Sequence, residues 1–381
     1  MIDQDLIQFT QDSIRIPSLT GQEQQFIERI CHEMNKLGYD RVWVDEAGNA
    51  IGEIRGTQQG KLILLDAHAD TVSVNANDWD YDPFGGVISH DRLYGRGTAD
   101  TKGNLAAMIY AAAKADRNKI RGSIFVSASV HEEVFEGGSL KLIVEQTKPD
   151  YVVIGEATDL NLNRGGRGRA EVIVETIGQS AHSSSPEIGD CAVHAMIQLI
   201  HTVESQPTAN HPVLGPGSMV LTDILSSPYP GYSVIPNRCR VTFDRRLLIG
   251  ETIDSLENEL ARLAEKARVK CKINILDADE TTYSGYKLEG KKFFPAWLMA
   301  DDELFVQESL RALQKIKADT RLSAYRFCTN AAYCAGIAGI PTIGYGLGKE
   351  TDAHTVNESI SINDLNMAAQ GFQAIIEKVL G

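Results

Sequence analysis

The chain has 381 residues, enough for two domains that each bury their own core. Charged residues make up 23% and hydrophobic residues 43%, and the net charge of −14 disfavours nucleic acid or an anionic membrane as the main partner. The sequence shows no apolar run near the roughly 20 residues that span a bilayer. It also shows no signal-peptide pattern, and its six scattered cysteines include no CxxC pair, so we expect reduced thiols and a cytoplasmic protein.

The first 160 residues alternate helical and strand patterns. Helices are expected at Asp3–Ile16 and Gln22–Leu37, the second with a capping start in TGQEQ, and an alanine-rich helix is expected at residues 104–116. Apolar runs predict three strands of a sheet that is covered on both faces: Lys61–Asp66, Ser123–Val130 and Tyr151–Ile154. This alternation is typical of an α/β layer architecture.

From about Arg169 the pattern changes to strand, helix, two strands, helix and strand, which is the order of a ferredoxin-like split βαβ unit. After about Lys291 the α/β pattern returns, with PTIGYG as a strand and Ile362–Leu380 as a closing helix. We therefore expect a discontinuous α/β domain with a central, mostly parallel sheet at residues 1–165 and 286–381. The α+β domain inserted into it would cover residues 166–285.

Five clusters of acids and histidines fall at or after predicted strand ends of the larger domain. They are DAHAD (His68, Asp70), GRGTADTKG (Asp100), VHEEVFEGGS (Glu132, Glu133), VIGEAT (Glu156) and DAHTVNE (His354). Ligands of open α/β sheets bind at the carboxyl ends of strands, so these side chains are expected to converge. Crowded carboxylates raise one another's pKa, and divalent cations remove that cost. Imidazoles mixed with carboxylates suit zinc, and two ions could share one carboxylate.

Each cluster alone is weak evidence. A lone HxD is more often structural than metal-binding, an EE pair is usually a solvated face, and GRGTADTKG alone could be a turn. The stretch GGRGR at Gly165–Arg169 could suggest phosphate or RNA binding, but no helix follows it and the acidic chain disfavours RNA. The joint occurrence of all five clusters at strand ends favours a metal site.

These motifs, in this order and over essentially the whole chain, resemble the M20 metallopeptidase and deacylase family, which includes acetylornithine deacetylase and succinyl-diaminopimelate desuccinylase. The stretches SSPEIGD, DRRLLIGET and FFPAW resemble its branch of selenium-metabolism hydrolases. The resemblance implies a zinc-peptidase-like catalytic domain, with the insert as a lid and dimerisation domain of a homodimer. It also implies two divalent metal ions, with zinc favoured and cobalt or manganese as alternatives.

The resemblance assigns the metal ligands as His68 and Glu156 on one ion, Glu133 and His354 on the other, and Asp100 on both. Asp70 would orient the His68 imidazole. Glu132 would be the general base, taking a proton from the attacking water and delivering it to the leaving amine. The physical reason is that two metals activate water and polarise the scissile carbonyl, while a carboxylate that is not a ligand must move the protons.

In the insert, His182 of GQSAHSSSP matches the family histidine that reaches the partner subunit's active site and stabilises the tetrahedral oxyanion. Arg246 of VTFDRRL matches the arginine that pairs with the substrate carboxylate. Thr329 and Asn330 of FCTNAA match a turn that contacts the substrate. The chain departs from the family pattern at two positions, with Ser233 in place of asparagine in SVIP and His131 in place of aspartate before the EE pair.

We therefore interpret the sequence as that of a two-metal amidohydrolase acting on a small N-acyl amino acid or dipeptide-like substrate. A dipeptidase or carboxypeptidase is the alternative among enzymes, because both break an amide beside a carboxylate. From another class, the alternative is a metal-binding or regulatory homologue without catalysis. Asp70, Glu132 and His182 together argue against it, because binding metal alone needs no proton shuttle.

Overall fold

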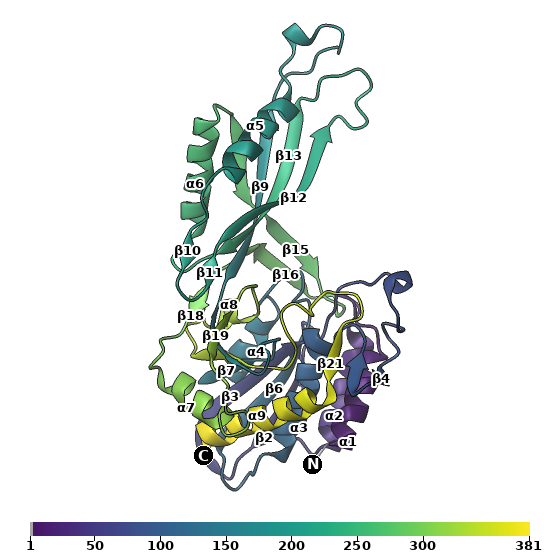
Figure 1. Ribbon diagram of the computed structural model, residues 1–381, viewed down its shortest axis with the longest axis vertical. Helices are drawn as coiled ribbons and strands as arrows, with labels where there is room; N and C mark the ends of the chain where they lie inside the picture. Colours follow the sequence, from purple (N-terminus) through teal and green to yellow (C-terminus); the bar gives the residue numbers. More distant parts are fainter. Residues whose placement is uncertain (1–2) are drawn as a thin grey trace. The chain divides into compact units, whose positions relative to one another are not determined.

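The computed structural model describes residues 3–381, which divide into two compact units (Figure 1). Unit 1 comprises residues up to Gly166 together with Asp279–Glu289 and Trp297–Gly381. Unit 2 comprises Arg167–Ala278 and Gly290–Ala296, and is thus inserted into unit 1 along the chain. Among the residues described, none of the helices is long and apolar enough to cross a bilayer.

Unit 1 is built on one large sheet. Its strands lie in the order β1 (Arg41–Val44), β2 (Ala50–Arg55), β6 (Arg121–Ser129), β3 (Gln58–His68), β7 (Tyr151–Ile154), β20 (Thr342–Gly344), β8 (Leu162–Gly166) and β18 (Trp297–Leu298), with β19 (Leu322–Tyr325) also paired to β8. The central strands β6, β3, β7 and β20 run parallel, whereas β1, β2 and β18 pair antiparallel. The predicted α/β fold with a central, mostly parallel sheet is therefore confirmed.

Helices cover both faces of this sheet (Figure 1). They are α1 (Gln4–Ile14), α2 (Gln24–Lys36), α3 (Gly103–Lys114), α4 (Leu140–Thr147), α7 (Leu304–Leu313), α8 (Ala331–Cys334) and α9 (Ile362–Leu380). Side chains of β3 alternate between two cores: Ile63 and Leu65 join the core that includes α3 and α9, and Leu64 joins the core of α4 and α8. Burial on both faces explains why β3 reads as an unbroken apolar run.

Shorter elements shape the loops of unit 1. A small sheet contains β4 (Val87–Ser89), β5 (Arg92–Tyr94) and β21 (Ser359–Ser361), and two short helical turns are η1 (Ala76–Asp78) and η2 (Thr98–Lys102). The hairpin of β15 (Asp277–Thr281) and β16 (Lys287–Lys291) places its tip in unit 1. There Tyr283 donates a hydrogen bond from its hydroxyl to the Gly48 carbonyl at 2.8 Å.

Unit 2 has the ferredoxin-like order that the sequence predicts. Its elements in chain order are β9 (Gly168–Ile177), η3 (Pro186–Ile188), α5 (Ala192–Glu204), β10 (Asn210–His211), β11 (Gly215–Pro216), β12 (Ser218–Ser227), β13 (Arg238–Leu247), α6 (Ile253–Lys266), β14 (Cys271–Ile275) and β17 (Phe293–Phe294). The antiparallel sheet β12-β13-β9-β14 buries alternate side chains of β9 against α5 and α6. Helix α6 begins with a capping box between Thr252 and Ser255.

The start of α2 differs from the prediction. TGQEQ provides no side-chain cap, because the carboxylate of Glu23 turns inward and is fully buried. Its Oε1 accepts hydrogen bonds from the backbone N–H of Gly21 at 3.0 Å and of His131 at 3.3 Å. The predicted cap is therefore wrong here, because the Glu23 carboxylate accepts a hydrogen bond from His131, 108 residues away, and not from the helix terminus.

Candidate metal centre

The carboxyl ends of the parallel strands bring most of the predicted site residues to one edge of the sheet. His68 ends β3, the pair Glu132–Glu133 follows β6, Glu156 follows β7, and His354 lies in the segment after β20. Asp100 is the exception, because it lies in η2 directly before α3 and not at the end of a strand of the large sheet. The motif GRGTADTKG does follow a strand of unit 1, but that strand is Arg92–Tyr94 of a small separate sheet.

Asp100 lies between the two imidazoles. Its Oδ1 is 2.9 Å from Nε2 of His68, and its Oδ2 is 3.1 Å from Nε2 of His354. A second carboxylate flanks each ring. Glu156 Oε1 is 3.4 Å from Nε2 of His68, and Glu133 Oε2 is 3.0 Å from Nε2 of His354. Ligand atoms of His68, Asp100 and Glu133 all lie within 4.8 Å of one another, close enough for shared metal binding.

The two sides of this centre differ in exposure. The His68 side chain is 1% exposed, whereas that of His354 is 51% exposed. Solvent therefore reaches the centre on the His354 side, whereas the His68 side is buried in the protein.

The electrostatics of the centre show an excess of acid. Burial, followed by neighbouring acids, raises the pKa of Glu132 and of Glu156 well above the usual range for glutamate. Burial alone would also raise the pKa of Asp100, but hydrogen bonds to His354 and His68 hold it below its usual range. Hydrogen bonds to Asp100 and Glu133 raise the pKa of His354 to about 10. Carboxylates placed this way favour any nearby positive charge, so the donor set fits divalent cations.

Asp70 contacts the site through both its backbone and its side chain. The Nδ1 atom of His68 lies 2.8 Å from the backbone carbonyl of Asp70 and 3.6 Å from its carboxylate. The carboxylate instead accepts the backbone N–H of Glu132 at 3.0 Å and of Glu133 at 3.1 Å, and the hydroxyl of Thr20 at 2.8 Å. The backbone of Asp70 thus orients the imidazole, and its side chain fixes the turn after β6.

Glu358 is a further site residue, to which the sequence patterns assigned no role. It is 1% exposed, and its Oε1 accepts the backbone N–H of Ala99 at 2.7 Å and of Asp100 at 3.1 Å. Its Oε2 accepts hydrogen bonds from the guanidinium of Arg96 at 2.6 Å and from the backbone N–H of Gly97 at 3.1 Å. The only signal in the sequence is an acid four residues after His354, which is indistinguishable from a solvated acid.

The side chains of Thr329 and Asn330 are buried in unit 1. The Asn330 amide donates to Asp66 Oδ2 at 2.9 Å and to Ser129 Oγ at 2.8 Å, and its oxygen accepts the Gly137 N–H at 2.6 Å. These contacts link the ends of β3 and β6. Substrate contact by Thr329 and Asn330 stays a prediction.

His182 and Arg246 belong to unit 2. His182 is exposed, and its Nδ1 accepts the backbone N–H of Ser184 at 3.1 Å. A neutral ring therefore carries its proton on Nε2. Arg246 lies on β13, with its Nε 3.0 Å from Oδ1 of Asp244.

The sequence comparisons show the family. Residues 64–378 match the peptidase family M20/M25/M40, and the chain belongs to this family. It is 32% identical to the protein YgeY of Escherichia coli (strain K12) over 380 residues, which cover 97% of this chain and 93% of that protein. It is 27% identical to the acetylornithine deacetylase of Vibrio atlanticus over 361 residues, with 91% and 89% covered. The predicted membership of the M20 family is confirmed.

Two solved structures share the fold over nearly their whole length. The M20 family metallo-carboxypeptidase Sso-CP2 from Sulfolobus solfataricus has a TM-score of 0.79 at 16% identity, with 99% of each chain covered. The dinuclear metal-binding M20 peptidase YxeP from Bacillus subtilis has a TM-score of 0.74 at 15% identity, with 99% and 98% covered. The chain is therefore a metal-dependent hydrolase of amide bonds, as its family membership, its deacetylase relative and its shared fold indicate.

Proposed function

We propose that the chain is a two-metal amidohydrolase that cleaves the amide bond of a small N-acyl amino acid or dipeptide-like substrate. The observation that carries this proposal is the position of Asp100, whose two oxygens each face a different imidazole. This arrangement suits a carboxylate that bridges two ions. His68 and Glu156 would complete one ion's ligands, and Glu133 and His354 would complete the other's.

Zinc is the proposed metal, and cobalt and manganese suit the same mixed ligands. When bound, two such ions lower the pKa of water and polarise a carbonyl. The dinuclear metal site named for the Bacillus subtilis peptidase, which shares this fold, supports the proposal of two ions.

Glu132 is the proposed general base. It is buried beside the predicted ligands, and burial followed by neighbouring acids keeps its pKa well above that of a solvated glutamate. A base with a raised pKa can take the proton of the attacking water and then protonate the leaving nitrogen of the amide. The Asp70 carboxylate accepts the backbone N–H of Glu132 and thereby fixes where this base stands.

In unit 2, His182 is the proposed donor to the tetrahedral oxyanion. Its Nδ1 accepts a backbone N–H, which leaves the proton on Nε2 for donation. We propose that it serves the site of a partner in a homodimer formed along β12, an edge strand with Ile224 and Leu225 48% and 61% exposed. Arg246 is the proposed partner of the substrate carboxylate.

The deacetylase relative favours an N-acyl amino acid as substrate, and the metallo-carboxypeptidase with the same fold keeps a dipeptidase or carboxypeptidase as the alternative. A metal-binding homologue without catalysis is the alternative from another class. Glu132 argues against it, because binding needs no buried base. A cytoplasmic location and the set of site residues remain part of the proposal.

The test is a substrate screen on purified protein that is stripped with a chelator and reloaded with zinc, cobalt or manganese. We expect hydrolysis of N-acyl amino acids or dipeptides only in the reloaded protein. Better turnover of N-acyl amino acids than of dipeptides identifies a deacylase, and the reverse order identifies a peptidase. Binding of metal without hydrolysis of either class would contradict the proposed function.

A further inference from the structure

The turn that carries Glu132 is held by buried carboxylates in addition to the backbone hydrogen bonds that the Phe135 N–H donates to the carbonyls of His131 and Glu132. His131 has φ 65, a left-handed conformation that residues other than glycine seldom adopt. The three consecutive N–H groups of residues 131–133 all donate to buried carboxylates: the first to Glu23 and the next two to Asp70. The direction of the Glu132 side chain therefore depends on where Glu23 and Asp70 stand.

One short segment, residues 20–23, sets the position of both carboxylates. The Thr20 hydroxyl donates to Oδ2 of Asp70 at 2.8 Å. At the next residue, the Gly21 N–H donates to Oε1 of Glu23 at 3.0 Å, and the same oxygen accepts a hydrogen bond from the His131 N–H at 3.3 Å. Residues more than 100 positions away in the chain thus define the geometry of the turn after β6.

A local role for Glu23 does not explain these contacts. Glu23 lies at the start of α2, yet its side chain makes no capping hydrogen bond there. A solvated helix-terminal glutamate would also not be fully buried, as Glu23 is. Its carboxylate is held inside the protein by the contact to His131, next to the proposed base.

We propose that Thr20 and Glu23 are positioning residues for catalysis: together they hold the turn at residues 131–133 so that Glu132 meets the attacking water in the right geometry. This inference rests on the proposed function, in which Glu132 is the general base. Displacing a catalytic group by about 1 Å can cost on the order of 100-fold in rate. The loss falls on kcat, because the contact matters in the transition state and not in substrate binding.

The variants Glu23→Ala and Glu23→Gln separate positioning from charge. Oε2 of Glu23 has no hydrogen-bond partner within residues 3–381, so glutamine can present its oxygen to Gly21 and His131 and lose no bond. Glu23→Ala removes the acceptor. We expect Glu23→Ala to lower kcat by roughly 10- to 100-fold with KM and bound metal unchanged, and Glu23→Gln to restore most of it.

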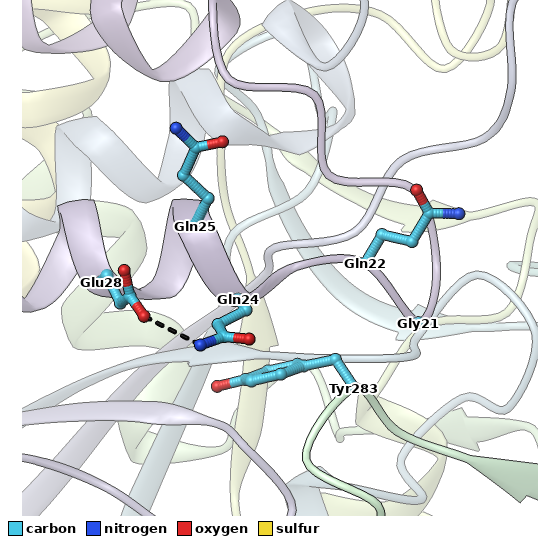
Figure 2. A pocket seen from close by; sticks show the side chains of 6 residues that line it. All are labelled: Gly21, Gln22, Gln24, Gln25, Glu28 and Tyr283. Atoms are coloured by element: carbon cyan, nitrogen blue, oxygen red, sulfur yellow. Dashed lines mark hydrogen bonds between the residues drawn. The ribbon is translucent and has the colours of Figure 1, made fainter.

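A neighbour on the same helix is the matched control. Figure 2 shows the outer side of this segment, where Gly21, Gln24 and Tyr283 line a surface pocket of about 370 Å³ and Gln24 donates to Glu28 at 3.0 Å. Gln24→Ala removes that exposed hydrogen bond without touching Glu23. We expect wild-type kcat in this variant.

Amide hydrogen exchange gives a second measurement that does not depend on activity. In the metal-loaded protein, Glu23→Ala should speed exchange in the peptide that contains residues 131–133, whereas Glu23→Gln and Gln24→Ala should not. If Glu23→Ala fails to fold, Thr20→Val removes one hydrogen bond to Asp70 and is judged by the same two measurements.

Three results would overturn the inference. Unchanged exchange and unchanged kcat in Glu23→Ala show that Glu23 does not hold the turn. A Glu23→Gln variant as impaired as Glu23→Ala shows that ionised charge, and not an acceptor oxygen, is required. Faster exchange without any loss of kcat shows that the turn does not place the base. Absence of amide hydrolysis in the wild type would instead refute the proposed function, while the exchange data still decide whether Glu23 holds the turn.

Discussion

Replacing Glu358 by glutamine is expected to loosen the metal centre by freeing the loop that carries Asp100. One oxygen of Glu358 accepts the N–H groups of Ala99 and Asp100, and the other accepts the guanidinium of Arg96 at 2.6 Å. Glutamine keeps the size of the side chain but has only one oxygen. In Glu358→Gln the guanidinium therefore loses its counter-charge, and an amide NH₂ meets donors where an acceptor is needed.

The magnitude follows from burial. Arg96 is 4% exposed and Glu358 1% exposed, so neither charge is solvated once its partner is gone. Removing one member of a buried ion pair costs about 3–5 kcal/mol in the free energy of unfolding. Glu358 also accepts the backbone N–H of the proposed bridging ligand, and such outer contacts contribute roughly 10- to 100-fold to metal affinity.

Two assays measure these losses. Urea unfolding in the presence of a chelator gives the free energy of unfolding, and competitive titration against a zinc-binding dye gives the metal affinity. Both are made above pH 7, because burial raises the pKa of Glu358 to about 7 and the ion pair needs the ionised form. The control is Glu308→Gln, which breaks a half-solvated pair with Lys378 at 3.0 Å and should cost less than about 1 kcal/mol. Equal stability and equal zinc affinity in the two variants would refute the reasoning.

Four further predictions follow from the proposed site. Glu132→Ala should keep its metal and lose roughly 10² to 10⁴-fold in kcat, whereas Glu133→Ala should lose metal; metal analysis beside kinetics checks both. Arg246→Ala should raise KM for free-acid substrates far more than for the same substrates as amides, so equal effects on both would assign the arginine to the fold. Refolding Glu132→Ala together with His182→Ala should return about a quarter of wild-type activity if the histidine acts across a dimer, and simple mixing should return none. Burial raises the pKa of Glu23 from 4.5 to about 7, so the folded chain holds a proton that the unfolded chain releases between these values. This group alone should therefore lower the free energy of unfolding by up to about 3 kcal/mol as the pH rises through this window, and urea unfolding at both ends of the window should show a fall in Glu23→Gln that is smaller by this amount.

Helices and strands were predictable from the sequence where a regular pattern of apolar residues matches the burial of the element along its whole length. Strand β7 and helix α9 have the bounds that their apolar patterns predict, Tyr151–Ile154 and Ile362–Leu380. Strands β4, β5 and β21 were not predictable, because runs of three residues with mixed burial carry no usable period. The capping prediction at Glu23 failed for another reason: local sequence cannot report a partner in a turn 108 residues away.

The same limit explains why the sequence points to the predicted ligands and misses the residues that position them. Histidines and acids after strands predict a cation site by chemical type alone, and the structure brings His68, Asp100 and His354 together. Glu23 and Glu358 are the same type of residue, but they accept backbone N–H groups 108 and 258 residues away. Only the folded structure distinguishes the acids that face the imidazoles of the site from the acids that accept backbone N–H groups.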